Sequence, residues 1–338
     1  MRAMVLESAN RVSLEEVKRP VREMGETLIR VSHTGICGTD LKIFQGGIAV
    51  DYPRIMGHES VGEVIEGGTG VTSGVPVIVD PAYFCGNCYI CRAGQPHLCP
   101  NGGLIGRDVD GGFADYLSVP AQNAYVLPDA IDVAAAPLIQ PMTTCLHAQR
   151  LANISPGEAV IVMGLGVTGL LHVQLAKAHG AYPVIGITRS RWKLDLAEEL
   201  GADLALPPDE NVRERVLQAT GGRGADLVIE SVGKLSVLAQ AIDLARIGGR
   251  LVLFGIYTEK EGELPFYDLY FKELGLINTR AAQARDFPAC IEFVRRGVVK
   301  LKPLISHTLP LEDMDAALDL LDTGGANRMK IIFDHAGG

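Results

Sequence analysis

The chain has 338 residues, of which 47% are hydrophobic and 21% are charged, so it is long enough for two globular domains and does not have the composition of a disordered protein. Its formal net charge of -9 argues against non-specific attraction to nucleic acid or to an anionic membrane surface. No apolar run is long enough to span a bilayer, and the N-terminus lacks the apolar core of a signal peptide, so we expect a cytoplasmic protein.

Short β-like runs between glycine-rich turns characterise the chain to about residue 126. They fall at residues 5–6, 28–31, 60–65, 75–79 and 114–119. This pattern predicts a partly closed antiparallel barrel. Residues 1–17 alternate in polarity as an edge strand does.

Two glycine-flanked turns in this part carry residue types that bind metals. Cys37 lies in the first turn, residues 35–40, and His58 and Glu59 follow Gly57 in the second. A cysteine, a histidine and a carboxylate would leave one coordination position open, which is typical of a catalytic zinc. We expect Asp40 to fix the Cys37 turn by hydrogen bonding rather than to take part in the chemistry.

Four of the seven cysteines fall in one short loop, residues 85–99, with the spacing C-x2-C-x2-C-x7-C: Cys85, Cys88, Cys91 and Cys99. Four thiolates at this spacing can converge on a tetrahedral structural zinc, although an iron–sulfur cluster also uses four thiolates. We favour zinc, because the loop lies between predicted strands and the sequence shows no second cluster and no electron partner.

From about residue 130 the pattern changes to alternating helices and strands. A helix is predicted over residues 132–151, interrupted at Pro141. An apolar strand over residues 159–163 then runs into Gly164-x-Gly166-x-x-Gly169 and a helical pattern, and a second strand follows at residues 183–187. Glycines in this context let backbone N–H groups approach a pyrophosphate at the N-terminus of the helix, so we predict a dinucleotide site.

The residues after the second strand bear on the choice of coenzyme. An NAD site usually has an acidic residue here, but this chain has Thr188, Arg189, Ser190 and Arg191. We therefore favour NADP over NAD, with the two arginines as partners of the 2′-phosphate and the two hydroxyl groups as donors. The alternative is that both arginines are simply solvated.

The remaining elements complete a doubly wound sheet and a final mixed segment. Helices are predicted at residues 193–200, 212–220 and 236–245 and strands at 226–230 and 250–254. The final segment contains predicted helices at 286–296 and 311–322 and strands at 305–309 and 330–334.

The Cys37 turn, the Gly57-His58-Glu59 turn, the four-cysteine loop and the glycine motif, in this order, resemble the zinc-dependent medium-chain alcohol dehydrogenases. The resemblance implies an α/β protein with a GroES-like β-barrel catalytic domain and a Rossmann coenzyme domain. It implies a catalytic domain over residues 1–143, a coenzyme domain over residues 144–277, and a return segment over residues 278–338 that completes the catalytic domain.

The resemblance also implies roles for individual residues. Cys37 and His58 match catalytic zinc ligands, Glu59 matches a direct ligand or its close partner, and Thr39 matches the hydroxyl group that receives the substrate proton. Contacts to the coenzyme are expected from Thr144, Gly164, Gly166, Val167 and Gly169. The implied reaction is hydride transfer between an alcohol or ketone and the nicotinamide, with one catalytic and one structural zinc ion in each chain of a homodimer or homotetramer.

Gln140 departs from the family pattern, because relatives have glutamate or cysteine at this position. We expect zinc to be held by Cys37, His58 and Glu59, with water or substrate as the fourth ligand and Gln140 hydrogen-bonded to that water. The Gln140-Pro141 context favours a secondary alcohol or a polyol as the substrate. Alternatives are a zinc-independent NADPH-dependent reductase of enones or quinones and a non-catalytic coenzyme-binding protein.

Overall fold

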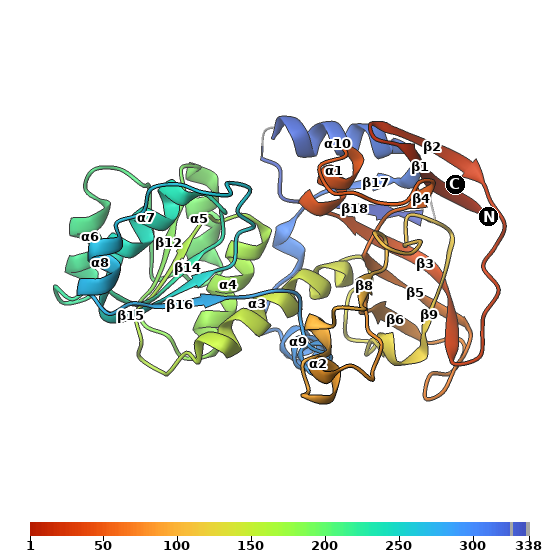
Figure 1. The fold of residues 1–338 in the computed structure, drawn as a ribbon, viewed down its shortest axis with the longest axis horizontal. Coiled ribbons are helices and arrows are strands. Elements are labelled where there is room, and N and C mark those ends of the chain that lie inside the picture. Colours follow the sequence, from red (N-terminus) through yellow and green to blue (C-terminus); the bar gives the residue numbers. More distant parts are fainter. Residues whose placement is uncertain (325–326, 336–338) are drawn as a thin grey trace. The chain divides into compact units, whose positions relative to one another are not determined.

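The computed structural model describes residues 1–324 and 327–335 of the chain (Figure 1). It forms two compact units. The barrel unit contains Met1–Thr143 and Gln283–Gly338, and the parallel-sheet unit contains Thr144–Ala282. Residues 278–282, which we assigned to the return segment, fall in the parallel-sheet unit in this division. Residues 325–326 and 336–338 of the expected return segment lie outside the described residues.

A seven-stranded sheet forms the main layer of the barrel unit, in the order β10-β6-β5-β3-β18-β17, with β9 also paired to β3. Its strands are β3 (Glu26–Ile36), β5 (Glu59–Glu66), β6 (Pro76–Val79), β9 (Tyr116–Pro120), β10 (Ala124–Val126), β17 (Ile305–Pro310) and β18 (Lys330–Asp334). Strand β18 pairs antiparallel with β3, so the last segment of the chain completes a sheet begun by the first. This return is the one that the family resemblance implied.

A second sheet contains β1 (Arg2–Ser8), β2 (Arg11–Glu16) and β4 (Arg54–Ile55) in the order β2-β1-β4. Strand β1 is therefore an interior strand, and our prediction of an edge strand over residues 1–17 was wrong for its first half. The reason lies in the packing: Ala3 to Leu6 are all buried, in one apolar cluster with Leu318 and Phe333 of the return segment. A short pair, β7 (Ala82–Tyr83) and β8 (Gly103–Leu104), flanks the four-cysteine loop.

The helices of the barrel unit are α1 (Gly38–Phe44), α2 (Tyr89–Arg92), α9 (Asp286–Arg295), α10 (Met314–Thr323) and the start of α3 (Ile139–Ala152). Short 3-10 turns lie at Pro96–Leu98, Ala121–Asn123, Ala136–Leu138, Lys302–Leu304 and Leu311–Asp313. The predicted interruption at Pro141 is absent from the described helix: α3 begins at Ile139, which places Pro141 in the first turn. A proline is tolerated there because first-turn N–H groups have no intrahelical acceptor.

The parallel-sheet unit contains six parallel strands in the order β13-β12-β11-β14-β15-β16, which confirms the predicted doubly wound sheet. The strands are β11 (Val160–Met163), β12 (Val184–Ile187), β13 (Leu204–Leu206), β14 (Ala225–Glu230), β15 (Ala245–Leu253) and β16 (Gly275–Asn278). The helices are α4 (Val167–Ala178), α5 (Arg191–Glu199), α6 (Val212–Ala219), α7 (Leu235–Leu244) and α8 (Phe266–Phe271). Among the helices of the described residues, none is long and apolar enough to cross a membrane.

The carboxyl group of Asp80, directly after β6, is buried beside that of Asp286. Burial, reinforced by the charge of Asp286, raises the pKa of Asp80 from its usual value near 4 to about 6. Because the folded pKa exceeds the unfolded one, the stability that this group contributes is lost as pH rises from about 4 to about 6. We expect Asp80→Asn to increase the free energy of unfolding by about 2 to 3 kcal/mol at pH 8 and to change little at pH 4, measured by urea denaturation. An equal effect at both pH values would contradict this account.

Candidate active site

Cys37 lies at the junction between strand β3 and helix α1, where it forms the N-cap of the helix. Its Sγ accepts a hydrogen bond from the Thr39 N–H at 3.2 Å, and the Asp40 carboxylate accepts one from the Cys37 N–H at 2.9 Å. This reciprocal capping begins a helix at Gly38, where we expected only a turn, and it confirms the hydrogen-bonding role expected for Asp40.

His58 faces Cys37 from the residue before strand β5. Strands β3 and β5 pair so that Gly35 lies opposite Glu59, and this register brings the ends of the two strands together. The Nε2 atom of His58 is 3.1 Å from Cys37 Sγ. Its Nδ1 atom is 3.2 Å from Asp40 Oδ1, and this second contact is an ion pair rather than a well-aligned hydrogen bond. A carboxylate at Nδ1 orients the imidazole so that Nε2 is presented with the thiolate.

The charges of this group are interdependent. Burial disfavours the imidazolium, but the Asp40 carboxylate and the Cys37 thiolate outweigh it and hold the pKa of His58 well above its usual value. Burial also opposes ionisation of Asp40, yet His58 and the Cys37 N–H lower the pKa of Asp40 below its usual value. Asp40 and His58 are both buried, and a cysteine sulfur beside an imidazole nitrogen is a donor pair that zinc binds.

Glu59 is turned toward a partner that our sequence analysis missed. Both of its carboxylate oxygens lie 2.7 Å from Lys330 Nζ, which also donates to the Ile36 carbonyl at 3.2 Å. Both side chains are buried. Among the described residues, one of the two groups of potential metal ligands that lie within 4.8 Å of one another consists of Cys37, Asp40 and His58, and Glu59 belongs to neither group.

The glycine at position 35 makes room for this ion pair. A Cβ atom on Gly35 would lie 2.0 Å from Glu59 Oε2. Lys330 could not be found from local pattern, because it is 271 residues from Glu59 and reaches it only through the pairing of β18 with β3.

Thr39 and Gln140, the other residues with predicted roles in this unit, are both partly buried. Thr39 lies in the first turn of α1, and Gln140 lies in the first turn of α3, where its carbonyl accepts a hydrogen bond from the Thr143 hydroxyl at 2.6 Å. The predicted contacts of Thr39 with substrate and of the Gln140 amide with water stay predictions.

The four clustered cysteines do converge, with their sulfur atoms all within 4.8 Å of one another. Cys99 Sγ lies 3.5 Å from Cys85 Sγ and 3.8 Å from Cys88 Sγ. Tetrahedral zinc with bonds of about 2.3 Å to sulfur places its ligands about 3.8 Å apart, so the donor set fits this ion. Backbone N–H groups of Asn87 and Cys88 lower the pKa of Cys85 to about 6, which favours the thiolate that a metal needs.

The glycine motif connects strand β11 to helix α4 as predicted. Gly164 has a φ of +90°, which favours glycine, and Gly166 is the N-cap of α4. A Cβ atom on Gly169 would lie 1.9 Å from the Gly164 carbonyl oxygen, so only glycine allows the helix to approach the loop this closely. The first N–H groups of α4, beginning at Val167, lack intrahelical acceptors, which is the arrangement that binds a phosphate.

The proposed phosphate partners follow strand β12, between the sheet and helix α5. Arg189 is exposed, and Arg191 is 84% exposed and pairs with Asp195 at 2.9 Å. Thr188 extends the strand through a hydrogen bond from its N–H to the Leu206 carbonyl, and Ser190 is the N-cap of α5. Thr144 begins the parallel-sheet unit on helix α3.

Two family models match the chain: an alcohol dehydrogenase GroES-like domain over residues 23–129 and a zinc-binding dehydrogenase over residues 167–296. The chain is 36% identical to an L-threonine 3-dehydrogenase of Pyrococcus abyssi, covering 95% of this chain and 94% of the relative. It is 31% identical to a sorbitol dehydrogenase of Halalkalibacterium halodurans, covering 93% of each.

Solved structures agree in fold over nearly the whole chain. A putative zinc-binding dehydrogenase from Sinorhizobium meliloti, bound to NADP, matches with a TM-score of 0.93 and 32% identity, covering 98% of each chain. An alcohol dehydrogenase from Escherichia coli, complexed with NADH, matches with a TM-score of 0.91 and 32% identity, covering 99% of each chain.

Proposed function

The chain belongs to the zinc-type medium-chain alcohol dehydrogenase family, and from this premise we propose that it oxidises the CH–OH group of a secondary alcohol or polyol, with Cys37 and His58 holding a catalytic zinc ion. Hydride transfer between an alcohol or polyol and a nicotinamide coenzyme follows from the family. The metal ligands, the coenzyme preference and the substrate class are our proposal. The observation that carries it is the 3.1 Å contact between Cys37 Sγ and His58 Nε2.

In this proposal each residue of the site has one task. Cys37 supplies a thiolate and His58 supplies Nε2, while Asp40 holds the imidazole through its Nδ1 atom. When bound, zinc acts as a Lewis acid on the substrate oxygen. The Thr39 hydroxyl, in the first turn of α1 two residues after Cys37, would accept a hydrogen bond from the alcohol O–H and pass its proton on to solvent.

Glu59 and Gln140 complete the proposed site. Glu59 acts as the third ligand by releasing one carboxylate oxygen from Lys330, whose ammonium group keeps the other. A neutral amide is a weaker ligand than a carboxylate or thiolate, so Gln140 contributes a hydrogen bond to the water or substrate that takes the fourth position. The second zinc ion is structural and is held by the four clustered cysteines.

We also propose that NADP is preferred, because Arg189 and Arg191 stand where NAD sites have an acidic residue. Arg191 forms an ion pair with Asp195, so Arg189 makes the stronger contact with the 2′-phosphate. We expect Arg189→Glu to raise KM for NADP at least tenfold and to change KM for NAD by less than threefold, measured by initial rates. Arg215→Glu, on helix α6, is the matched control. An NAD preference in the unaltered protein would overturn the assignment.

The substrate class is tested by the initial rate of coenzyme reduction at 340 nm against secondary alcohols, polyols, L-threonine and primary alcohols. The proposal predicts turnover of at least one secondary carbinol and little turnover of primary alcohols. A preference for primary alcohols would contradict it. Activity on enones without zinc would instead support the zinc-independent reductase alternative, and any turnover excludes a non-catalytic protein.

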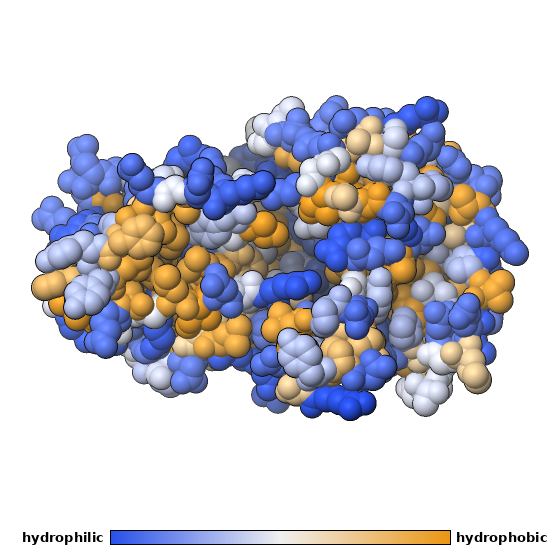
Figure 2. All heavy atoms as spheres, viewed as in Figure 1, coloured by the Kyte–Doolittle hydropathy of each residue, from blue (hydrophilic) through white to orange (hydrophobic). Residues whose placement is uncertain are grey.

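We propose that the protein forms a homodimer or homotetramer through the β16 edge of the parallel-sheet unit. Strand β16 pairs only with β15 among the described strands, and Leu276 is 47% exposed. Helix α8 exposes four aromatic side chains: Phe266, Tyr267, Tyr270 and Phe271. Figure 2 shows apolar side chains gathered on the face that carries these elements. An unpaired edge beside exposed aromatic groups is typical of a surface that a second copy covers.

Analytical ultracentrifugation tests this surface. The unaltered protein is expected at two or four times 36.1 kDa, and the double variant Tyr270→Glu with Leu276→Lys at a lower mass. Tyr182→Glu changes another largely exposed tyrosine, elsewhere in the same unit, and is expected to keep the mass. A monomer in the unaltered protein would refute the proposal.

A further inference from the structure

Two loops of the parallel-sheet unit follow neighbouring strands at their carboxyl ends. We call them the β14 loop, residues 231–233, and the β15 loop, residues 254–257. The strand order reverses between β11 and β14, because the chain passes from β11 to β12 and β13 on one side and then returns to the other side of β11. Dinucleotides bind at such a reversal, outside the carboxyl ends of the strands. Both loops therefore border the crevice in which we expect the coenzyme.

The direction of the coenzyme across this crevice follows from the predicted contacts at its other end. In a sheet of this kind the adenosine ribose lies at the end of the second strand, here β12, and the pyrophosphate lies at the N-terminus of the first helix, here α4. The nicotinamide half must then extend to the opposite side of the glycine motif, over the ends of β14 and β15.

The β14 loop contacts the glycine motif through two side chains. Ser231 Oγ lies 3.0 Å from Thr168 Oγ1, in the first turn of α4. Val232 lies beside Gly164, because a Cβ atom on Gly164 would be 2.6 Å from Val232 Cγ2. Val232 is nevertheless 44% exposed. Its side chain is therefore available to pack against the flat ring of a bound nicotinamide.

A buried carboxylate holds the β14 loop in place. Glu230 is the last residue of β14 and is fully buried. Its Oε1 accepts hydrogen bonds from the Val232 N–H at 2.7 Å and from the Gly233 N–H at 3.0 Å. A buried N–H that loses its acceptor is costly, so these bonds restrict the positions that Val232 can take.

Tyr257 ties the β15 loop to the same carboxylate. Its hydroxyl donates to Glu230 Oε2 at 2.6 Å, and its ring packs against the apolar cluster of this unit. Burial and the hydrogen bond to Glu230 raise the pKa of Tyr257 above its usual value, so the hydroxyl keeps its proton. The backbones also lie close together, since a Cβ atom on Gly255 would be 2.1 Å from the Gly233 nitrogen. A shift of one loop must therefore move the other.

We propose that Glu230 and Tyr257 are positioning residues for the nicotinamide half of the coenzyme. They act through Val232, which their hydrogen bonds hold beside the glycine motif. Loss of the Tyr257 hydroxyl would leave Glu230 Oε2 with the Gly233 N–H alone and would loosen both loops. The inference rests on the predicted coenzyme site at the glycine motif. It does not depend on the zinc ligands, the NADP preference or the substrate class.

Isothermal titration of the full-length protein tests this role. The ligands are NADPH and NADH, each compared with its own adenosine fragment, 2′,5′-ADP or 5′-AMP. We expect Tyr257→Phe to raise the dissociation constant of the reduced coenzyme at least fivefold and that of the fragment less than twofold. Glu230→Gln, which keeps the shape but replaces one acceptor oxygen, and Val232→Ala are expected to give the same pattern. A purely structural role would weaken the coenzyme and the fragment together.

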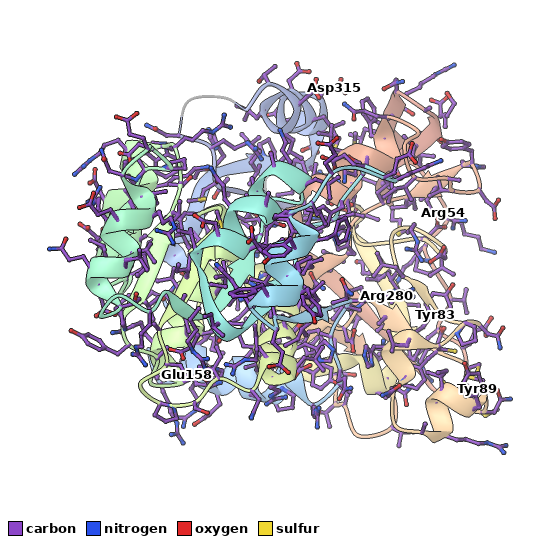
Figure 3. All side chains as sticks on the ribbon, turned by 60° about the vertical axis from the view of Figure 1, so that its left-hand side comes forward. Arg54, Tyr83, Tyr89, Glu158, Arg280 and Asp315 are labelled. Carbon is purple, nitrogen blue, oxygen red and sulfur yellow. The ribbon has the colours of Figure 1, made fainter. Side chains whose placement is uncertain are left out.

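Matched controls exist for each variant. Glu158, labelled in Figure 3, has a side chain only 17% exposed and forms an ion pair at the opposite end of the sheet, just before β11. Glu158→Gln is therefore the control for Glu230→Gln. Tyr182→Phe changes an exposed tyrosine of the same unit, and Val298→Ala changes a valine of 44% exposure in the barrel unit. All three controls are expected to keep both dissociation constants within twofold. A circular dichroism melt of each variant separates loss of binding from loss of the fold.

Two results would overturn the inference. One is a dissociation constant for the reduced coenzyme that stays within twofold in both Tyr257→Phe and Glu230→Gln. The other is an equal loss of coenzyme and fragment in these variants. A failure of the zinc or NADP assignments would leave the titration pattern unchanged, so it is distinguishable from a failure of this inference. An unaltered protein that bound neither coenzyme would refute the proposed function and this inference together.

Discussion

His58→Asn is expected to lower kcat/KM at least a thousandfold and to reduce the zinc content by one ion per chain. The substitution removes Nε2, which lies 3.1 Å from Cys37 Sγ, and leaves only one of the two donors that the structure brings together. It also leaves the buried Asp40 carboxylate without its ion-pair partner, so we expect a loss of roughly 1 to 3 kcal/mol in the free energy of unfolding. Zinc is measured by plasma mass spectrometry beside the kinetics and the unfolding curve.

A matched control exists in the same unit. His307, on strand β17, is bonded to the Ser306 hydroxyl at 2.8 Å and does not belong to either cluster of potential metal ligands in the described residues. His307→Asn is therefore expected to keep both zinc ions and nearly full activity. If His58→Asn kept two zinc ions, or if both variants lost activity equally, the assignment of His58 would be wrong.

Cys99→Ala is expected to remove the other zinc ion and to lower the melting temperature by on the order of 10 °C, because a structural zinc site contributes its binding free energy to folding. Cys99 is the buried member of the cluster, and its sulfur contacts those of Cys85 and Cys88. The short strands and helix around the loop supply little apolar packing of their own, since α2 has four residues, none of them buried. Differential scanning calorimetry and zinc analysis give the two readouts.

Cys290→Ala is the control for this variant, because Cys290 is also buried but does not lie in the cluster. It is expected to keep both zinc ions and to change the melting temperature by only a few degrees. Two results would contradict a structural zinc at the four cysteines. One is a Cys99→Ala protein that still binds two zinc ions, and the other is a Cys99→Ala protein with the same melting temperature as Cys290→Ala. Four iron atoms and sulfide in the purified protein would support the iron–sulfur alternative.

The local sequence pattern was sufficient to predict features that are formed by residues close together in the chain. The spacing of Cys85, Cys88, Cys91 and Cys99 fits within one loop, and the sulfur atoms converge as predicted. The glycine motif lies between consecutive elements, and the steric reason for Gly169 is its contact with Gly164 five residues earlier. Strand β11, which is buried along its whole length, is recognisable as an uninterrupted apolar run.

Features that depend on strand pairing were not predictable in the same way. Lys330 reaches Glu59 only because β18 lies beside β3, and no local signal distinguishes it from a surface lysine. Helix α1 was missed because its start depends on reciprocal hydrogen bonds between Cys37 and Asp40, a pair unlike the usual serine or threonine with glutamate. Strand β16 was missed because its four residues are mostly exposed and carry no alternating pattern.

A zinc ion at Cys37 and His58 is, in our proposal, required for alcohol oxidation. The most direct test is the rate of coenzyme reduction with the best secondary alcohol or polyol, measured before treatment with 1,10-phenanthroline, after it, and after zinc is restored, with zinc content followed in each sample. We expect the rate to fall at least a hundredfold as one zinc ion is lost and to recover when zinc returns. An unchanged rate in a sample that has lost the zinc ion whose binding requires His58 would show that this zinc ion is not needed for the reaction.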